Sequence, residues 1–301
     1  MMAEFYIIAE SFTQNAASSK EQIETKIEAF GSDFINIRKH KETNKLFINP
    51  EIYNILFINN ISISDLLYND EISNKNIDRD ARNMLKKIVL ETETNSINSK
   101  EVIEVLLPEH NEDLCHGLIA FNSVDGVDPE FQIVYNEKGW LKFRRHYLGL
   151  YPKNEEFFIS ECRKYFPNII FHNNTITSIS SIFNNFPKKI VYHLEALNDR
   201  FRESEDGLRH RQQVLTHFSG NCNLDTTASL EGNADKKPLF TYEFVNDEGN
   251  NQSVCCEPHI KLCTSDTPGD NTYYQNRIYF HEGFENIEEN KILIGHIGGH
   301  L

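Results

Sequence analysis

The sequence predicts an α+β fold with two domains: a mixed N-terminal domain over residues 1–185, and a C-terminal domain over 186–301 in which a helical region precedes an antiparallel β-meander. One observation is the helical spacing of apolar residues over 188–217. The other is a quick succession of strand-like runs, at 239–245, 253–263, 277–281 and 291–297. Helices followed by a run of strands are typical of α+β domains, and 301 residues are enough for two domains.

The N-terminal domain opens with a strand around Phe5–Ala9 and a helix after it. Ser19 and Gln22 have the spacing of a capping box, and apolar residues then recur every three or four positions. We expect this helix to end near Gly31, because glycine disfavours helix interiors. Further helices are expected from Asp78 and from Ser99, the latter as an N-cap.

The sequence predicts mostly extended structure in the middle of the chain. Residues 117–151 contain three strand-like runs, and 136–139 have the composition of a hairpin turn. A helix is expected over 154–166, and extended chain over 168–182. The long helical stretch that follows contains Gly207, where we expect a break.

Charge and composition exclude some classes of function. The 45 acidic residues outnumber the 30 Lys and Arg, for a formal charge of -15, which argues against a generic nucleic-acid coat or an anionic-membrane binder. No apolar run approaches the roughly 18 residues of a membrane span, and the start lacks the basic region of a signal peptide. We therefore expect a cytoplasmic protein without a membrane partner, whose six cysteines are reduced.

A local basic island interrupts this acidic background. Residues 137–164 hold seven Lys and Arg against four acids, interleaved with aromatic residues. Cations for phosphates and aromatic rings for base stacking are typical of single-strand binding surfaces. We predict that Lys142, Arg144 and Arg145 bind RNA, the alternative being a hairpin and helix with core aromatics and solvated cations.

The C-terminal strands carry most of the residues suited to catalysis. Alternation places His259 and Lys261 on one strand face, and Arg277, Tyr279 and His281 on another. His296 follows in the last strand. RNA cleavage without metal needs a base for the 2′-hydroxyl, a cation for the phosphorane and an acid for the leaving oxygen. The predicted catalytic residues are Arg277, His296, Lys261, His281 and Tyr279.

The runs Arg277-Ile278-Tyr279-Phe280 and Lys291-Ile292-Leu293-Ile294-Gly295-His296 resemble the final strand pair of RelE/HigB-type mRNA interferase toxins. The resemblance implies an endoribonuclease that acts on RNA or the ribosome, with Arg277, His296 and Lys261 in cleavage. It also implies a toxin–antitoxin or phage-defence role, a protein partner or inhibitor, and an N-terminal domain that regulates the toxin-like domain. The sequence departs from these basic toxins in charge, since residues 219–301 hold 13 acids and five Lys and Arg.

Two alternatives to a metal-independent nuclease are open. The C-terminus offers His and carboxylate side chains that suit Zn²⁺ or Mn²⁺, although no compact ligand motif is present and we expect no cofactor. The candidate ligands are His259, His281, Glu282, His296 and His300, with Glu257, Asp266 and Asp270 nearby. The other alternative is a non-catalytic adaptor in a larger defence complex, whose acidic surface meets a basic partner protein. The sequence also allows the chain to form an oligomer.

Overall fold

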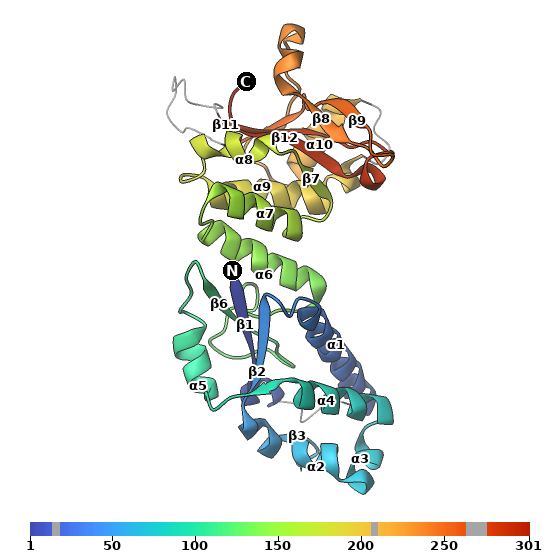
Figure 1. Ribbon diagram of the computed structural model, residues 1–301. Coiled ribbons are helices and arrows are strands. Elements are labelled where there is room, and N and C mark those ends of the chain that lie inside the picture. Colours follow the sequence, from blue (N-terminus) through green and yellow to red (C-terminus); the bar gives the residue numbers. More distant parts are fainter. Residues whose placement is uncertain (14–18, 206–209, 263–275) are drawn as a thin grey trace. The chain divides into compact units, whose positions relative to one another are not determined.

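The computed structural model describes residues 1–13, 19–205, 210–262 and 276–301, and the chain divides into two compact units (Figure 1). Unit 1 is Met1–Tyr147 and unit 2 is Leu148–Leu301, so the division differs from the boundary expected after residue 185. The reason is a pairing that sequence cannot reveal: β7 (Ile169–Phe171) joins the C-terminal sheet by pairing in parallel with β12 (Ile292–Gly299). The fold is α+β with a C-terminal strand region, as predicted.

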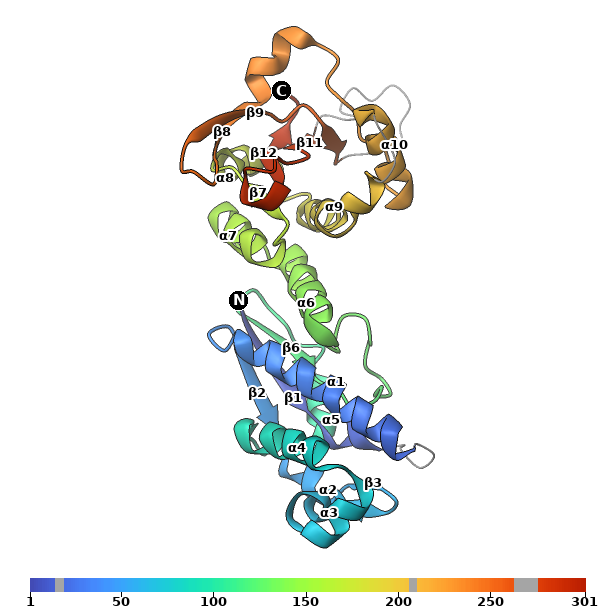
Figure 2. The same cartoon turned by 90° about the vertical axis from the view of Figure 1, so that its right-hand side faces the viewer.

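Unit 1 is built on a four-stranded parallel sheet in the order β5-β2-β1-β6. Helices α1 and α5 lie on opposite sides of this sheet (Figures 1 and 2), which buries both faces, as parallel sheets require. The strands are β1 (Met2–Ile7), β2 (Asn44–Ile48), β3 (Leu56–Ile58), β4 (Ile61–Ser62), β5 (Glu93–Thr94) and β6 (Leu114–Leu118). The helices are α1 (Lys20–Lys39), α2 (Ile63–Tyr68), α3 (Asp70–Asn76), α4 (Arg79–Glu91) and α5 (Ser99–Glu101), which a π-helical turn continues.

Side-chain caps begin the helices of unit 1 largely where the sequence predicts. The capping box of Ser19 and Gln22 is confirmed, and Asp78 caps α4 by accepting a bond from the Ala81 amide at 2.7 Å. The cap of α5 was predicted one residue late, because the Asn98 side chain, not that of Ser99, accepts from the Glu101 amide.

Helix α1 does not end at Gly31, as expected, but continues to Lys39. A Cβ atom at Gly31 would lie 2.5 Å from both Cγ and Sδ of Met84 on α4. The glycine therefore serves close helix packing rather than helix termination.

The hairpin predicted around 136–139 is wrong, because these residues open helix α6 (Asn136–Leu150). The Asn136 side chain accepts a bond from the Gly139 amide at 3.2 Å in the first turn. Trp140, Phe143 and Tyr147 then recur at helical spacing and are buried. Their aromatic content resembles a strand, but their spacing of three and four places them on one helix face.

Unit 2 contains a four-stranded sheet in the order β10-β11-β12-β7. Its antiparallel part, β10 (His259–Lys261), β11 (Asn276–His281) and β12, is the predicted meander. The strands β8 (Thr241–Val245) and β9 (Asn251–Cys255) form the hairpin expected around 246–250, as a separate two-stranded sheet.

The helices of unit 2 are α7 (Glu155–Tyr165), α8 (Asn174–Ser178), α9 (Pro187–Arg200) and α10 (Arg211–Asn221). The helix over 154–166 is confirmed, whereas 168–182 is extended only in β7. The break expected at Gly207 lies outside the described residues.

The hairpin and the helices cover opposite faces of the unit 2 sheet. Tyr279 and Leu293 share a core with Phe240, Phe244 and Val254 of the hairpin region. Phe280, next to Tyr279 and so on the other face, contacts Phe201 after α9, with 5.5 Å between ring centroids. Among the described helices of both units, none combines the length and apolar character needed to cross a bilayer.

Candidate functional site

The register of the C-terminal sheet brings together four of the predicted catalytic residues. His259, Tyr279 and His296 form one row across β10, β11 and β12. Lys261 and Arg277 pair in the adjacent row, which Gly298 completes. Imidazole, phenol, ammonium and guanidinium groups therefore share one end of the sheet.

Arg277 is the centre of the exposed part of this group. Its Nη1 donates to Oε2 of Glu231 at 2.8 Å and to the hydroxyl of Tyr279 at 3.2 Å. The same Oε2 lies 3.5 Å from Nε2 of His300. We call this group the Arg277 cluster, whose members are Glu231, His259, Lys261, Arg277, Tyr279, His296 and His300.

The row of His259, Tyr279 and His296 is more deeply buried than the row of Lys261 and Arg277. His259 and His296 are only 2% and 8% exposed, and their rings lie 5.2 Å and 5.7 Å from that of Tyr279. His259 bonds to the Ser229 hydroxyl at 3.1 Å, and Nε2 of His296 donates to the Gly299 carbonyl at 2.9 Å. These bonds fix the two rings in the row next to Arg277.

Burial and Arg277 set the ionisation of the cluster. Burial first, and then the Arg277 charge, lowers the pKa of His259 to about 4, and burial also lowers the pKa of His296. The pKa of Lys261 is lowered for the same two reasons. Although burial works to raise the pKa of Glu231, Arg277 holds it below its usual range.

His300 is the most exposed imidazole of the cluster. Its side chain is 36% exposed, and its pKa is lowered by burial and by Arg277. Near neutral pH this ring is therefore a neutral imidazole beside a guanidinium, an arrangement suited to accepting a proton from a group that Arg277 has bound.

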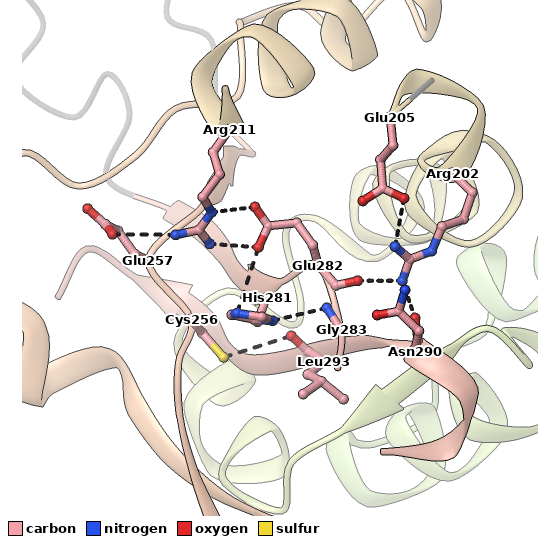
Figure 3. Close-up of polar contacts among 10 residues, drawn as sticks. All are labelled: Arg202, Glu205, Arg211, Cys256, Glu257, His281, Glu282, Gly283, Asn290 and Leu293. Atoms are coloured by element: carbon pink, nitrogen blue, oxygen red, sulfur yellow. Dashed lines mark hydrogen bonds and ion pairs between the residues drawn. The ribbon is translucent and has the colours of Figure 1, made fainter. Parts of the chain in front are cut away.

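The fifth predicted catalytic residue, His281, belongs to a different group (Figure 3). Its Nδ1 accepts from the Gly283 amide at 3.0 Å, and its ring stacks on Phe284. Its Nε2 lies 4.0 Å from the Glu282 carboxylate, which Arg211 engages with two bonds of 2.7 Å and 2.6 Å. We call this group the Arg211 cluster, whose members are Arg202, Glu205, Arg211, Glu257, His281 and Glu282.

The bonds of the Arg211 cluster join helices to the sheet. Arg202 donates to the backbone carbonyls of Glu282 and Asn290 and to the Glu205 carboxylate, the last at 2.7 Å (Figure 3). Arg211 begins α10 and pairs with Glu282 just after β11. Cations that hold backbone carbonyls and bidentate carboxylates are committed to structure, so we assign this cluster a structural role.

The predicted RNA-binding residues do not form an exposed basic surface, and this part of the prediction is corrected. Arg144 is buried, and its guanidinium donates to the carbonyls of Met1 and Thr43 at 3.0 Å and 2.8 Å. Arg145 is also buried. Lys142 is exposed but pairs with Glu130. The alternative, that the aromatics here are core residues, fits the burial of Trp140.

Aromatic and hydrogen-bond contacts join two loops at the usual ligand position of the parallel sheet in unit 1. In such sheets the crevice lies where the strand order reverses, here at the carboxyl ends of β1 and β6. Phe12, just after β1, stacks on Phe121, just after β6, with 5.4 Å between ring centroids. The Asn122 amide and side chain both donate to the Ser11 carbonyl at 3.0 Å. In the described part of the chain, these contacts link the loops that follow β1 and β6.

The described residues contain no group of three or more His, Cys, Asp or Glu placed to hold a metal ion. The suggested ligands separate, since His281 and Glu282 lie in the Arg211 cluster whereas His259, His296 and His300 lie in the Arg277 cluster. Asp266 and Asp270 fall outside the described residues.

Sequence reasoning missed Glu231 altogether and weighed His300 only as a metal ligand. Glu231 lies 46 positions before Arg277, in a polar segment without a motif. The polar composition of 218–237 indicates a loop but carries no information about which strand the loop crosses.

No protein-family model matches the chain, and no significant match to it is found among curated proteins or solved structures. We therefore base the assignment of function on the residues of the Arg277 cluster alone.

Proposed function

We propose that unit 2 is a metal-independent endoribonuclease whose site is the Arg277 cluster. The observation that carries the proposal is the strand register, which sets Lys261 beside Arg277 and places His259, Tyr279 and His296 in the neighbouring row. A guanidinium, an ammonium and an accessible neutral imidazole are the groups that intramolecular RNA cleavage needs.

The roles follow from exposure and pKa. Arg277 binds the scissile phosphate, and Nε2 of His300 takes the proton of the 2′-hydroxyl. The 2′-oxygen forms a bond to phosphorus as the bond to the 5′-oxygen breaks. Lys261, whose lowered pKa makes it a better acid, gives that oxygen a proton. The products are a 2′,3′-cyclic phosphate and a 5′-hydroxyl, and solvent then returns the two proton carriers to their starting states.

The buried row has a supporting role in this proposal. Tyr279 receives a bond from Arg277 and accepts one from the Leu301 amide at 3.4 Å. His296 holds the Gly299 carbonyl, just before His300. Both residues therefore position the groups that contact RNA, and His296 moves from the predicted proton carrier to a positioning residue.

The biological setting that we propose is a regulated toxin in the cytoplasm, in a toxin–antitoxin or phage-defence system. In this setting unit 1 regulates the toxin-like unit through a protein partner or inhibitor. Ribosomal, messenger and transfer RNA are the candidate substrates.

The test is cleavage of these RNAs by the full chain in the presence of a chelator, with the new ends analysed for 2′,3′-cyclic phosphate. Loss of a preorganised cationic contact costs roughly 10²–10³ in rate, so we expect Arg277→Ala to lose cleavage by that factor. Lys291→Ala is the control, since this side chain pairs with Glu288 away from the cluster. Equal cleavage by the two variants, or cleavage that requires added metal, would contradict the proposal. No cleavage by the wild type would favour the adaptor.

A further inference from the structure

The carboxylate of Glu231 occupies the position at Arg277 where the proposed function needs a phosphate. Its Oε2 accepts from Arg277 and also faces His300. Both side chains of the Arg277–Glu231 pair are partly exposed, at 13% and 15%. The pair is therefore covered but not sealed from solvent.

The segment that carries Glu231 is attached to the sheet at one side and to a short helix at the other. The backbone of Ser229 exchanges two hydrogen bonds with that of His259, at 3.1 Å and 2.9 Å. The 3₁₀ helix Ala234–Phe240 follows. Residues 230–233 between these attachments are in neither helix nor strand, so Glu231 can turn away without breaking regular structure.

The chemistry of the position fits an oxyanion. A guanidinium binds carboxylates and phosphates with the same planar donor geometry, so a ligand phosphate and Glu231 compete for the same donors. Lys261, the register partner of Arg277, adds a second cation for a phosphate. His300 lies beside this position, where its Nε2 can accept the 2′-hydroxyl proton once Glu231 has left.

We propose that Arg277 and Lys261, with His300 beside them, form a binding site for an RNA phosphodiester, which Glu231 occupies as an internal competitor in the free protein. This inference rests on the proposed function for the identity of its ligand. Glu231 must leave Arg277 before RNA binds, so the free chain, which is acidic overall, is held in a weakly binding state. A partner that draws the 230–233 segment away would activate it.

The test compares Glu231→Gln with wild type in binding a short fluorescent 2′-O-methyl RNA, which cannot be cleaved because its 2′-oxygens are blocked. The amide keeps the shape of Glu231 but removes the charge that competes with phosphate. We expect Glu231→Gln to bind the probe about tenfold more tightly. Inorganic phosphate should displace the probe from the variant at correspondingly lower concentrations.

Glu205→Gln is the matched control for charge. It removes one carboxylate that pairs with an arginine in the same unit, but at Arg202 in the Arg211 cluster. We expect this variant to bind the probe within about twofold of wild type, because long-range charge effects are screened beyond about 10 Å at moderate salt. If Glu231→Gln and Glu205→Gln gained the same affinity for the probe, the inference would be overturned, because the gain would then reflect only the lower net negative charge.

Cleavage measured in parallel separates this inference from the proposed function. Tighter binding by Glu231→Gln without cleavage by any variant would support the oxyanion site and contradict the nuclease. If the wild type cleaves RNA but Glu231→Gln binds the probe no more tightly than the wild type does, Glu231 is not a competitor, and the proposed nuclease activity is unaffected. Unchanged binding with lost cleavage would instead make Glu231 a group that orients His300.

Discussion

Burial sets the ionisation state of the histidines of unit 2, and His193 shows this most simply. His193 lies on α9 and is only 1% exposed. Neither of its ring nitrogens has a hydrogen-bond partner in the described part of the chain. Burial, and then the charge of Lys189, lowers its pKa to about 4. A neutral ring is therefore required in the folded state.

We expect the free energy of unfolding to fall as the pH drops from about 6.5 toward 4. In that window the unfolded chain binds a proton at His193 that the folded chain does not, so acid favours unfolding. Protonation of His193 can lower the free energy of unfolding by at most about 3 kcal/mol, because each unit of difference between the folded and unfolded pKa corresponds to about 1.36 kcal/mol. Urea denaturation at a series of pH values measures it.

The variant that isolates this contribution is His193→Leu, which should flatten the pH dependence and keep the fold at low pH. His217→Gln, an exposed position on α10, is the control and should retain the dependence of the wild type. An unchanged slope in His193→Leu would show that other groups, among them His259, cause the acid sensitivity.

At the same scale, the candidate site shows which residues a sequence can identify. Strand alternation, which is local, predicts that Arg277 and Tyr279 share a strand face, whereas only the register shows that Lys261 lies opposite Arg277. The place of Glu231 in the site cannot be predicted in this way, because it depends on the path of a loop. Alternation also groups His281 with Tyr279, but His281 is the last residue of β11, at the end away from Arg277, and it contacts Gly283 and the Arg211 cluster.

At the scale of elements, glycines decide how closely the layers approach. A Cβ atom at Gly295 on β12 would lie 2.2 Å from the Tyr242 ring of β8 and 3.1 Å from Sγ of Cys256. Since an aromatic ring in a packed core cannot yield as a flexible chain does, the hairpin can lie on the sheet only if position 295 has no side chain.

We therefore expect Gly295→Ala to lower the free energy of unfolding by roughly 1–3 kcal/mol, the usual cost of overpacking a core. Gly299→Ala is the control in the same strand, because a Cβ there meets nothing within 4 Å. When Gly295→Ala is combined with Tyr242→Leu, which replaces the ring that the new Cβ would meet, the loss of stability due to Gly295→Ala should be smaller. A stable Gly295→Ala would mean that the hairpin can shift.

The elements also show where sequence patterns fail. Ser19, Gln22 and Asp78 locate helix starts because a cap depends only on neighbouring residues. Gly31 misleads because its role is set by Met84, far away in the chain. Residues 136–143 mislead because β-prone aromatics were weighed above their helical spacing.

At the scale of the molecule, the division between units was misplaced for a related reason. Residues 148–185 precede the helical region that was taken as the start of the C-terminal domain. They belong to unit 2 because β7 completes its sheet and because Phe158 packs on Phe183, with 5.7 Å between ring centroids. A parallel pairing between residues 169–171 and 292–294 leaves no local signal in the sequence.

The net charge of -15 makes a prediction for the whole molecule. For single-stranded RNA, the slope of log K (the association constant) against log salt concentration becomes more negative by about 0.7 for each phosphate that the protein neutralises. If Arg277 and Lys261 are the cations that contact phosphate, the slope is shallow, at about -1.4. A basic nuclease with a broad cationic surface has a much steeper slope.

Fluorescence titrations of Glu231→Gln with the uncleavable RNA at several salt concentrations measure this slope. Removing one cation with Arg277→Ala in the same background should make the slope less negative by about 0.7, whereas Lys142→Ala should leave it unchanged. A slope beyond about -4 would require five or six phosphate contacts, and so a larger basic surface than the Arg277 cluster provides. Arg144, which is buried against backbone carbonyls, could not be among the contacts of such a surface.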